Sequence, residues 1–250
     1  ANWTKINKLK AKYGFKIIND NCHAIGSKYL NSNKYAVKYA DIVVQSYHAI
    51  KNITTGEGGS ILTNKRDIYK KISLFKTHGI TRSINEKKKF GLWYYDVKTV
   101  GLNFRLSDIQ CALGLSQFTK IDKFLAKRKR IANIYNKIFS NFNLIQLPKT
   151  FSDRISSYHI YPILINFDMI KITKKILFNK LEKLGYTLQV NYIPTYHFTI
   201  FKKNFKKTDF PNTEFFYKNQ VSLPCFVDLS NKDAFKFGYS LKKLLIKYEK

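Results

Sequence analysis

One lysine stands in a setting that the other lysines of this chain do not share. Lys51 lies in the stretch QSYHAIKNITTGEGG, residues 45–59, after Ser46 and His48 and before a Gly-Glu-Gly-Gly turn. Short apolar runs flank the stretch on both sides. A lysine amine can hold an aldehyde cofactor as a Schiff base and can later carry a proton. The sequence therefore raises the question of what else gathers around Lys51.

Two further residue types would complete such a site. A carboxylate facing a pyridine nitrogen keeps that nitrogen protonated, and Asp20 supplies a carboxylate at the end of an apolar run. A hydroxyl beside the lysine loop, together with backbone N–H groups, can hold a phosphate, and Ser46 supplies it. Taken singly, each has an ordinary reading as a turn, cap or solvated residue. Together, the three predict a site for pyridoxal phosphate.

The elements expected to position these residues alternate in the α/β manner. A helix over Trp3–Tyr13 ends at Gly14, and strands are predicted over 15–19, 41–45 and 60–63. Asp20 and Ser46 directly follow the first two strands. In open α/β sheets the loops after the strands converge on the ligand crevice, so we expect Asp20, Ser46 and Lys51 to lie close together.

The remainder predicts a large domain followed by a smaller α+β domain. A helix over 67–75 precedes a polar loop containing Glu86–Lys89, and a long helix capped by Ser107 has Ile109, Leu113, Phe118 and Ile121 on its apolar side and extends to Phe139. The elements expected after it are a strand over 159–165, a helix over 173–184, a strand over 187–192, a loop, and a helix over 231–248.

Composition excludes several classes of protein. The chain has 250 residues, 45 basic against 16 acidic, and a formal net charge of +29. The basic residues are dispersed, and the densest run, 127–130, falls in a helical pattern that predicts a solvated face, so we expect no nucleic-acid partner. A basic binding module stays open as an alternative. The charge favours an anionic small substrate.

Cysteine spacing and hydropathy indicate the cellular compartment in which the protein is expected. Cys22, Cys111 and Cys225 form no C-x-x-C pair, so neither a metal site nor a disulfide framework is expected. No apolar run approaches the roughly 18 residues that span a bilayer, and no signal-peptide pattern opens the chain. We expect a cytoplasmic protein with no membrane partner.

Several motifs resemble, in order and spacing, those of the DegT/DnrJ/EryC1/StrS sugar aminotransferases. They are DNCHAIG (20–26), SYHAIK (46–51) with EGG (57–59), HG (78–79) and GLNFRLSDIQ (101–110). The resemblance implies the type I fold of pyridoxal-phosphate aminotransferases, with the later part of a large domain that has a mixed, mostly parallel sheet over 1–120, and a connecting helix and small α+β domain over 121–250. It also implies that a front part of the family's chain precedes Ala1.

The resemblance assigns roles to matching positions. Lys51 matches the Schiff-base lysine, and Asp20 matches the partner of the pyridine nitrogen. His23 matches a residue that hydrogen-bonds the phenolic oxygen, and Cys22 would pack on the ring. Ser46 matches a phosphate-binding hydroxyl.

Three more positions follow from the same motifs. Asn103 matches an asparagine that reaches the phosphate from the neighbouring subunit, which implies a homodimer. Arg105 could face an anionic substrate or be a surface charge at a helix start. His48 could touch the phosphate or orient the lysine loop. His78 and Glu57 are expected to be structural.

Finer motifs resemble one subgroup, the UDP-4-amino-4,6-dideoxy-N-acetyl-β-L-altrosamine transaminases of the pseudaminic acid pathway. They are ALGLSQ (112–117), HIYPIL (159–164), QVNYIP (189–194) and VSLPC (221–225). The resemblance implies amino transfer from glutamate to the C4 carbonyl of a UDP-4-keto-6-deoxy-N-acetylhexosamine, in a pathway that serves surface glycans or flagellin glycosylation.

Two alternatives stay open at this point. A sugar dehydratase of the same fold would use the amine form of the cofactor, but such relatives carry His at the Schiff-base position, where this chain has Lys51. A truncated, inactive remnant is the other. Because part of the family's cofactor pocket lies in the expected front part, the chain alone is expected to bind the cofactor poorly.

Overall fold

The computed structural model describes residues 1–149, 151–201 and 205–250. The chain divides into two compact units, which are described separately. Unit 1 is Ala1–Ile121 with Asp153–Ile155, and unit 2 is Asp122–Ser152 with Ser156–Lys250. The assignment of 1–120 and 121–250 to the large and small domains of an aminotransferase stays a prediction.

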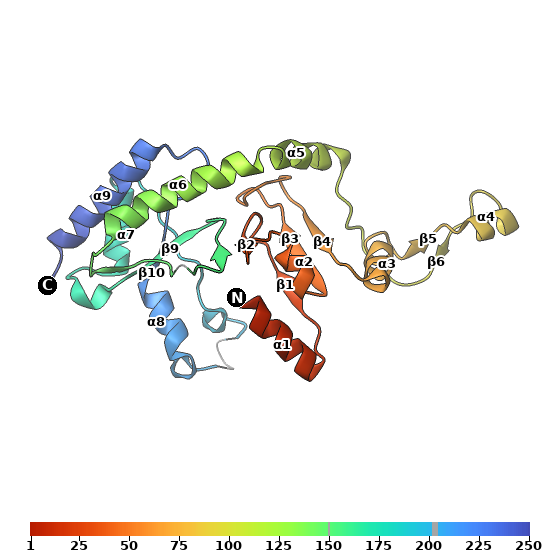
Figure 1. The fold of residues 1–250 in the computed structure, drawn as a ribbon, viewed down its shortest axis with the longest axis horizontal. Helices are drawn as coiled ribbons and strands as arrows, with labels where there is room; N and C mark the ends of the chain where they lie inside the picture. The colour runs from red at the N-terminus through yellow and green to blue at the C-terminus, as the bar shows by residue number, and fades with distance from the viewer. Residues whose placement is uncertain (150, 202–204) are drawn as a thin grey trace. The chain divides into compact units, whose positions relative to one another are not determined.

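Unit 1 is built on a three-stranded sheet in the order β1-β3-β4 (Figure 1). The strands are β1 (Ile18–Asp20), β3 (Ile42–Ser46) and β4 (Gly59–Leu62). β1 runs parallel to β3, with Asp20 opposite Val44, and β4 runs antiparallel to β3, with Gly59 opposite Ser46. The sheet is therefore mixed, with one pairing of each kind among the described strands.

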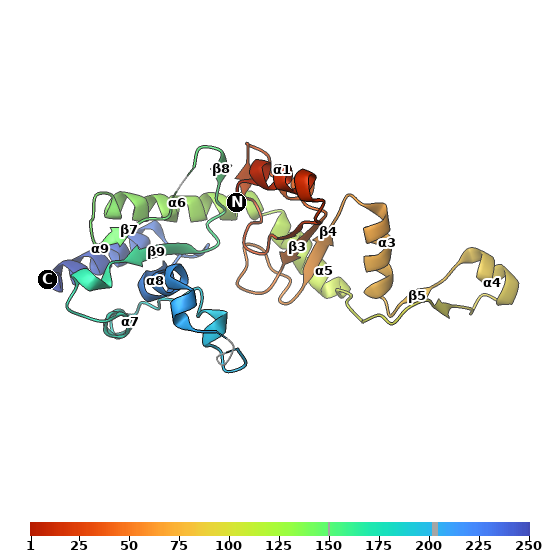
Figure 2. The same ribbon diagram turned by 90° about the horizontal axis from the view of Figure 1, so that it is seen from below.

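One face of this sheet is covered by helices. α1 (Trp3–Tyr13) and α2 (Tyr35–Tyr39) lie against it (Figures 1 and 2). Val43, at the middle of β3, is fully buried there among Tyr35, Tyr39 and their neighbours, with Trp3 packed at the edge. The helix expected over Trp3–Tyr13 is confirmed residue for residue, and it ends at Gly14 as expected.

A buried carboxylate joins the ends of this layer. The side chain of Asp41, just before β3, is 1% exposed. One carboxylate oxygen accepts hydrogen bonds from the Ile17 backbone N–H at 2.8 Å and from Lys10 Nζ at 2.7 Å, and the other pairs with Lys65 Nζ at 2.5 Å. These bonds hold the pKa of Asp41 far below its usual range, and those from the two lysines have the largest effect.

The rest of unit 1 extends from β4. Its elements are α3 (Arg66–Phe75), β5 (Ile80–Thr81), α4 (Ile84–Phe90), β6 (Asp96–Val97) and α5 (Asp108–Phe118), with β2 (Lys28–Tyr29) paired antiparallel to β8 (Arg154–Ile155). β5 and β6 form a two-stranded ribbon that carries α4. The polar loop predicted around Glu86–Lys89 is wrong: Ser83 caps a helix there by accepting a hydrogen bond from the Glu86 N–H.

The long helix predicted from Asp108 to Phe139 is interrupted. α5 ends at Phe118 and α6 (Ile121–Phe139) begins three residues later. The Thr119 hydroxyl donates to the Ser116 carbonyl at 2.9 Å. Hydroxyl bonds of this kind compete with the backbone hydrogen bonds that would continue the helix. The start at Asp108 with Ser107 as cap is confirmed.

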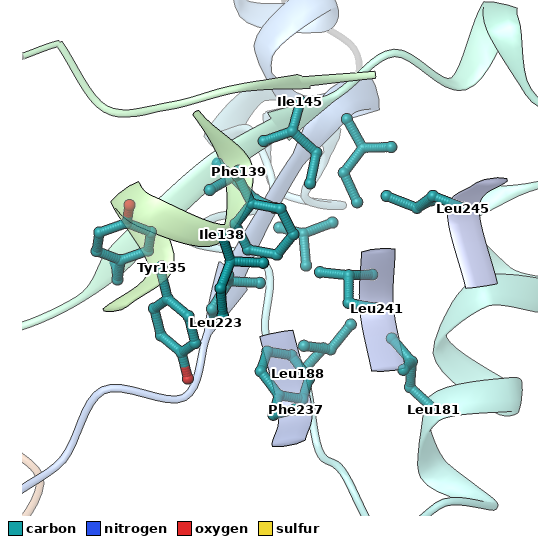
Figure 3. Close-up of a cluster of buried hydrophobic side chains, with 14 of the residues drawn as sticks. Tyr135, Ile138, Phe139, Ile145, Leu181, Leu188, Leu223, Phe237, Leu241 and Leu245 are labelled. Atoms are coloured by element: carbon teal, nitrogen blue, oxygen red, sulfur yellow. The ribbon is translucent and has the colours of Figure 1, made fainter. Parts of the chain in front are cut away.

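Unit 2 packs helices against an antiparallel sheet in the order β10-β9-β7. The strands are β7 (Ile145–Gln146), β9 (Tyr161–Ile165) and β10 (Gln220–Leu223), and the helices are α6, α7 (Lys174–Glu182), α8 (Pro211–Asn219) and α9 (Asn231–Lys247). Tyr135, Phe139, Phe237 and Leu241 meet in its core (Figure 3).

Two predictions in this unit are wrong. The strand expected over 187–192 is reduced to a single bridge between Gln189 and Ser222. The loop expected before the terminal helix contains α8 and β10. The sheet takes its edge strand from 220–223, where all four residues are buried, and leaves 187–192 beside it as irregular chain.

The solvated face predicted for residues 127–130 is also wrong at one position. Arg128 is 5% exposed, and its Nη1 donates to the backbone carbonyls of Tyr158, His159 and Cys225. The guanidinium thus satisfies carbonyls from two separate segments, which a run of basic letters does not reveal. Lys129 and Arg130 are exposed, as expected.

Within the described residues, no helix is both long enough and apolar enough to cross a membrane.

Replacing Asp41 by Asn should lower the free energy of unfolding of unit 1 by about 1 to 3 kcal/mol at neutral pH, because a charge-assisted hydrogen-bond pair is lost. The folded-state pKa is depressed, so this contribution is complete above the unfolded value and is lost as pH falls below about 4. The difference in the free energy of unfolding between wild type and variant should therefore become smaller in acid.

Urea denaturation followed by Trp3 fluorescence measures this, in a Trp93→Phe background because the chain has two tryptophans. Lys65→Ala is the control: that side chain is 41% exposed and its ion pair is screened by solvent, so a smaller loss is expected. Equal losses in the two variants would contradict the role given to Asp41.

Candidate functional site

Lys51 lies on a loop between β3 and β4 that is closed at its base. The Tyr47 N–H donates to the Gly58 carbonyl at 2.8 Å, and the Thr55 N–H donates to the Tyr47 carbonyl at 2.9 Å. Inside the loop, the Lys51 N–H donates to the His48 carbonyl at 2.9 Å. The backbone of Lys51 is thus held in a turn within a hydrogen-bonded loop.

The residues after Lys51 anchor the loop to the body of unit 1. Asn52, Ile53 and Thr55 are each at most 6% exposed. Asn52 Nδ2 donates to the carbonyl of Ile25, in the segment that follows β1, at 3.0 Å. Lys51 is therefore tied to the same segment that carries Asp20, Cys22 and His23.

Asp20 ends β1 beside this loop. Its Oδ1 accepts a hydrogen bond from the Cys22 N–H at 3.0 Å, and the Asn21 N–H continues the pairing with β3 by donating to the Val44 carbonyl at 2.9 Å. The pKa of Asp20 is lowered, first by hydrogen bonds from Cys22 and then by the positive charges of His23 and Lys51. The carboxylate is therefore ionised at neutral pH.

Cys22 and His23 respond to the same charges. Burial first and Asp20 second raise the pKa of the Cys22 thiol to about 11, with Lys51 opposing. Burial first and Lys51 second lower the pKa of His23, with Asp20 opposing. The structure therefore brings Asp20, Cys22, His23 and Lys51 within electrostatic reach of one another, and we call these four residues the lysine cluster.

Ser46 and His48 lie on the strand side of the loop. Ser46 Oγ accepts from the His48 N–H at 3.4 Å, and His48 Nδ1 accepts from the Ile50 N–H at 3.4 Å. His48 Nε2 lies 3.5 Å from Glu57 Oε1, between side chains that are 44% and 77% exposed. These contacts lie within the loop and are compatible with an orienting role for His48. That role, and a contact with the phosphate or a substrate, stay predictions.

Asn103 and Arg105 bond to each other. Arg105 Nε donates to Asn103 Oδ1 at 3.0 Å, and both residues are exposed. Within the described parts of the chain, neither is hydrogen-bonded or ion-paired to Asp20 or Lys51. Their roles toward a cofactor or substrate stay predictions.

The His78-Gly79 motif packs against the segment that carries Asn103. The His78 N–H donates to the Leu102 carbonyl at 3.0 Å. A Cβ added to Gly101 would lie 2.4 Å from the Gly79 nitrogen, so the two chains approach too closely for a side chain. This contact holds the backbone around Asn103 in place.

Gln110 is a positioning residue that the sequence analysis did not single out. Its Nε2 donates to the Glu57 carbonyl at 2.9 Å, and its Oε1 accepts from the Ser107 N–H at 2.9 Å. The start of α5 is thus fastened to the turn that ends the Lys51 loop. The Ser-x-x-Gln spacing of a capping box predicts the bond between Gln110 and Ser107. No local sequence pattern predicts the bond between Gln110 and the Glu57 carbonyl.

Gly58 completes this junction. A Cβ there would lie 2.5 Å from Thr55 Oγ1 and 2.6 Å from Leu106 Cδ2. A larger residue would push α5 away from the Lys51 loop, which explains the glycine at this position.

Comparison with known proteins identifies the family of this chain. The sequence profile described as the DegT/DnrJ/EryC1/StrS aminotransferase family matches residues 1–241. The chain is 37% identical over 246 residues to a UDP-4-amino-4,6-dideoxy-N-acetyl-β-L-altrosamine transaminase of Campylobacter jejuni subsp. jejuni serotype O:23/36. That alignment covers 98% of this chain and 63% of the relative.

Solved structures give the same relationship. Helicobacter pylori PseC, an aminotransferase involved in the biosynthesis of pseudoaminic acid, superposes with a TM-score of 0.90 at 32% identity, over 99% of this chain and 64% of that one. The PMP-form of a putative sugar aminotransferase, Spr1654 from Streptococcus pneumoniae, follows with a TM-score of 0.87 at 25% identity, over 99% and 67%. The chain thus has an α/β fold that spans about two thirds of these proteins.

Replacing Lys51 by Met should raise the pKa of His23, because a positive charge that disfavours the imidazolium is removed. The rise is partial, since burial is the larger cause and remains. Titration of the His23 ring protons by NMR, assigned with a His23→Gln variant, measures it. Lys51→Arg keeps the charge and should leave the pKa close to that of the wild type, and an unchanged pKa in Lys51→Met would show that the two residues do not interact.

Proposed function

Because the chain belongs to the DegT/DnrJ/EryC1/StrS aminotransferase family, we propose that it acts as a pyridoxal-phosphate-dependent sugar aminotransferase. The amino group would pass, with glutamate as donor, to the C4 carbonyl of a UDP-4-keto-6-deoxy-N-acetylhexosamine in pseudaminic acid biosynthesis. The family resemblance expected from the motifs is confirmed. Since the chain spans about 63% of the Campylobacter relative, the activity, substrates and partners of the whole protein are part of this proposal.

The observation that carries the proposal is that the Asn52 bond to the Ile25 carbonyl ties the Lys51 loop to the segment of Asp20 and His23, within electrostatic reach of Lys51. Pyridoxal phosphate needs an amine for its aldehyde, a carboxylate for its pyridine nitrogen and a hydrogen-bond donor for its phenolic oxygen. The Lys51 amine, the ionised Asp20 and a ring N–H of the His23 imidazole meet these needs. The residues present therefore fit the cofactor.

Each residue has a distinct task in the proposed reaction. When bound, pyridoxal phosphate supplies an electron sink for the carbon that loses a proton. Lys51 Nζ would hold the cofactor covalently and then move the proton as general base and acid. Asp20 would keep the ring nitrogen protonated, and the neutral Cys22 thiol would pack on the ring. Ser46 Oγ would accept or donate a hydrogen bond at the phosphate.

A homodimer would complete the phosphate site. Asn103 has no hydrogen bond to the lysine cluster of its own chain in the described residues, which is compatible with binding the phosphate in the site of a second copy. α5, which begins just after it, has no buried residue, and Ile109, Leu115 and Phe118 are 83%, 71% and 59% exposed. This apolar surface supports self-association beside Asn103. Arg105 would then face the phosphates or carboxylate of a substrate.

Borohydride reduction in the presence of pyridoxal phosphate tests the cofactor site. Peptide mapping should place the reduced adduct on Lys51 in excess over every other lysine, even if occupancy of the chain alone is low. Asp20→Asn should reduce occupancy about 10-fold or more, since an ionic hydrogen bond to the ring nitrogen is worth about 1.5 to 3 kcal/mol. The exposed Lys129→Met variant is the control and should label as the wild type does. Adducts spread evenly over the lysines would overturn the assignment.

Leu115→Asp should shift the chain from dimer to monomer in sedimentation velocity, because it buries a charge in the proposed apolar contact. Leu184→Asp, at a position that is 58% exposed in unit 2, is the matched control and should leave the dimer intact. A wild-type chain that is monomeric at micromolar concentration would contradict the dimer.

A further inference from the structure

The terminal helix α9 carries a second apolar stripe on its solvent side. Phe237 and Leu241 of α9 are at most 1% exposed and lie in the core of unit 2 (Figure 3). Phe235, Tyr239 and Ile246, in contrast, are 39%, 59% and 53% exposed, and the first two rings stack with their centroids 6.5 Å apart. Their spacing of i, i+4 and i+11 places these three side chains on one face of the helix, here called the outer stripe.

A row of exposed lysines runs beside the outer stripe. Lys232, Lys236 and Lys243, here called the lysine row, each stand three residues before one member of the stripe. Residues three apart are neighbours on a helix surface, so the row can place an ammonium group beside each apolar side chain. Asp233, the acidic residue of α9, belongs to the helix start, where it accepts a hydrogen bond from Ser230 Oγ at 2.6 Å. The outer stripe is therefore an apolar line edged by positive charge.

We propose that the outer stripe and the lysine row bind the surface of a membrane that contains anionic lipids. The two rings and Ile246 would enter the boundary between headgroups and acyl chains, while the lysines would stay at the lipid phosphates. The expectation of no membrane partner rested on the lack of a membrane-spanning run, which a surface contact does not need. The contact would lie in unit 2 and goes beyond the aminotransferase function proposed for Lys51 in unit 1.

The size of the outer stripe favours a membrane over a protein partner. A large apolar side chain offers about 150 to 250 Å², so three that are each about half exposed offer about 300 Å². A stable protein interface buries about 800 Å² on each partner, whether the partner is another protein or a second copy of the chain. Binding to an anionic membrane gains from the lysines as well as from the apolar area, so a narrow stripe is sufficient for it.

The composition of the outer stripe favours a membrane over a nucleic acid. The lysine row suits both, because both present phosphates. Phe235 and Tyr239 could stack on bases, but Ile246 has no aromatic face for a base and gains only from an apolar medium such as acyl chains. Residues 235–246 extend over about 16 Å at 1.5 Å per residue, so a helix that lies flat on the surface can bring all three side chains into contact with it.

Cosedimentation of the whole chain with lipid vesicles tests the proposal. Vesicles of phosphatidylcholine with phosphatidylglycerol should bind about 10-fold more tightly than vesicles of phosphatidylcholine alone, because each lysine at an anionic surface strengthens binding about 5-fold. Binding should weaken as the salt concentration rises. Since the formal net charge of +29 attracts the chain to any anionic surface, variants must locate the contact. Equal binding to the two kinds of vesicle would overturn the proposal.

Two pairs of aromatic substitutions locate the apolar part of the contact. Phe235→Ser with Tyr239→Ser should weaken binding to the anionic vesicles about 10-fold or more, because apolar area that would enter the membrane is lost. Phe215→Ser with Phe216→Ser is the matched control: these rings on α8 are 58% and 42% exposed, so a similar area is removed, and affinity should stay unchanged. Melting curves by circular dichroism check that each variant is folded. Equal weakening by the two pairs would contradict the proposal.

Two sets of lysine substitutions separate the lysine row from the net charge. Glutamine at all three positions of the row should weaken binding to the anionic vesicles about 10-fold or more. Glutamine at Lys70, Lys71 and Lys76, exposed lysines in and just after α3, lowers the net charge equally but should weaken binding about 3-fold or less. Equal effects of the two sets would refute the role of α9. So would a single-stranded oligonucleotide that needs the aromatic pair of α9 for its binding when the vesicles do not.

Discussion

The parallel pairing of β1 with β3 is the constraint on which the rest of unit 1 depends. Because the two strands run in the same direction, their carboxyl ends meet at one edge, where Asp20 lies opposite Val44 and Ser46 follows two residues later. An antiparallel pairing would have placed the end of β1 beside the start of β3. The loop leaving Ser46 then has to turn next to the segment leaving Asp20, and the Asn52 bond to the Ile25 carbonyl fastens the two. The position of Lys51 thus follows from strand direction.

Two further interactions keep that geometry fixed from opposite ends. Asp41 accepts from the Ile17 N–H just before β1, so the carboxylate sets the point at which the parallel pair begins. At the other end, Gln110 reaches the Glu57 carbonyl and joins α5 to the turn that closes the Lys51 loop. One bond is buried and charged, and the other is neutral and exposed. The loop is therefore held more firmly on the strand side than on the α5 side.

Sequence reasoning succeeded where the local pattern and the tertiary contacts agree. The grouping of Asp20 with Lys51 follows from residues at strand ends, and α1, α3 and α9 follow from periodicity and caps, to within a residue. It failed where distant contacts decide. Residues 187–192 have the pattern of a strand, yet residues 220–223 form the buried edge strand of the sheet. Arg128 donates hydrogen bonds to carbonyls that are 30 to 97 residues away in the sequence. The bond from Gln110 to the Glu57 carbonyl joins residues 53 apart in the sequence, so no local pattern could predict it.

The same alternation that predicts the strands places apolar side chains on both faces of the sheet, and helices of the described chain cover one of these faces. Tyr35, Tyr39 and Val43 bury one side, and Ile18 and Ile61 are apolar on the other side without a partner in the described chain. A surface that had adapted to water would carry polar residues at these alternate positions. Since Asp20 shares that side and is exposed, water weakens the interaction of its carboxylate with Lys51. Asp20 and the exposed isoleucines are therefore neighbours on a single face of the sheet.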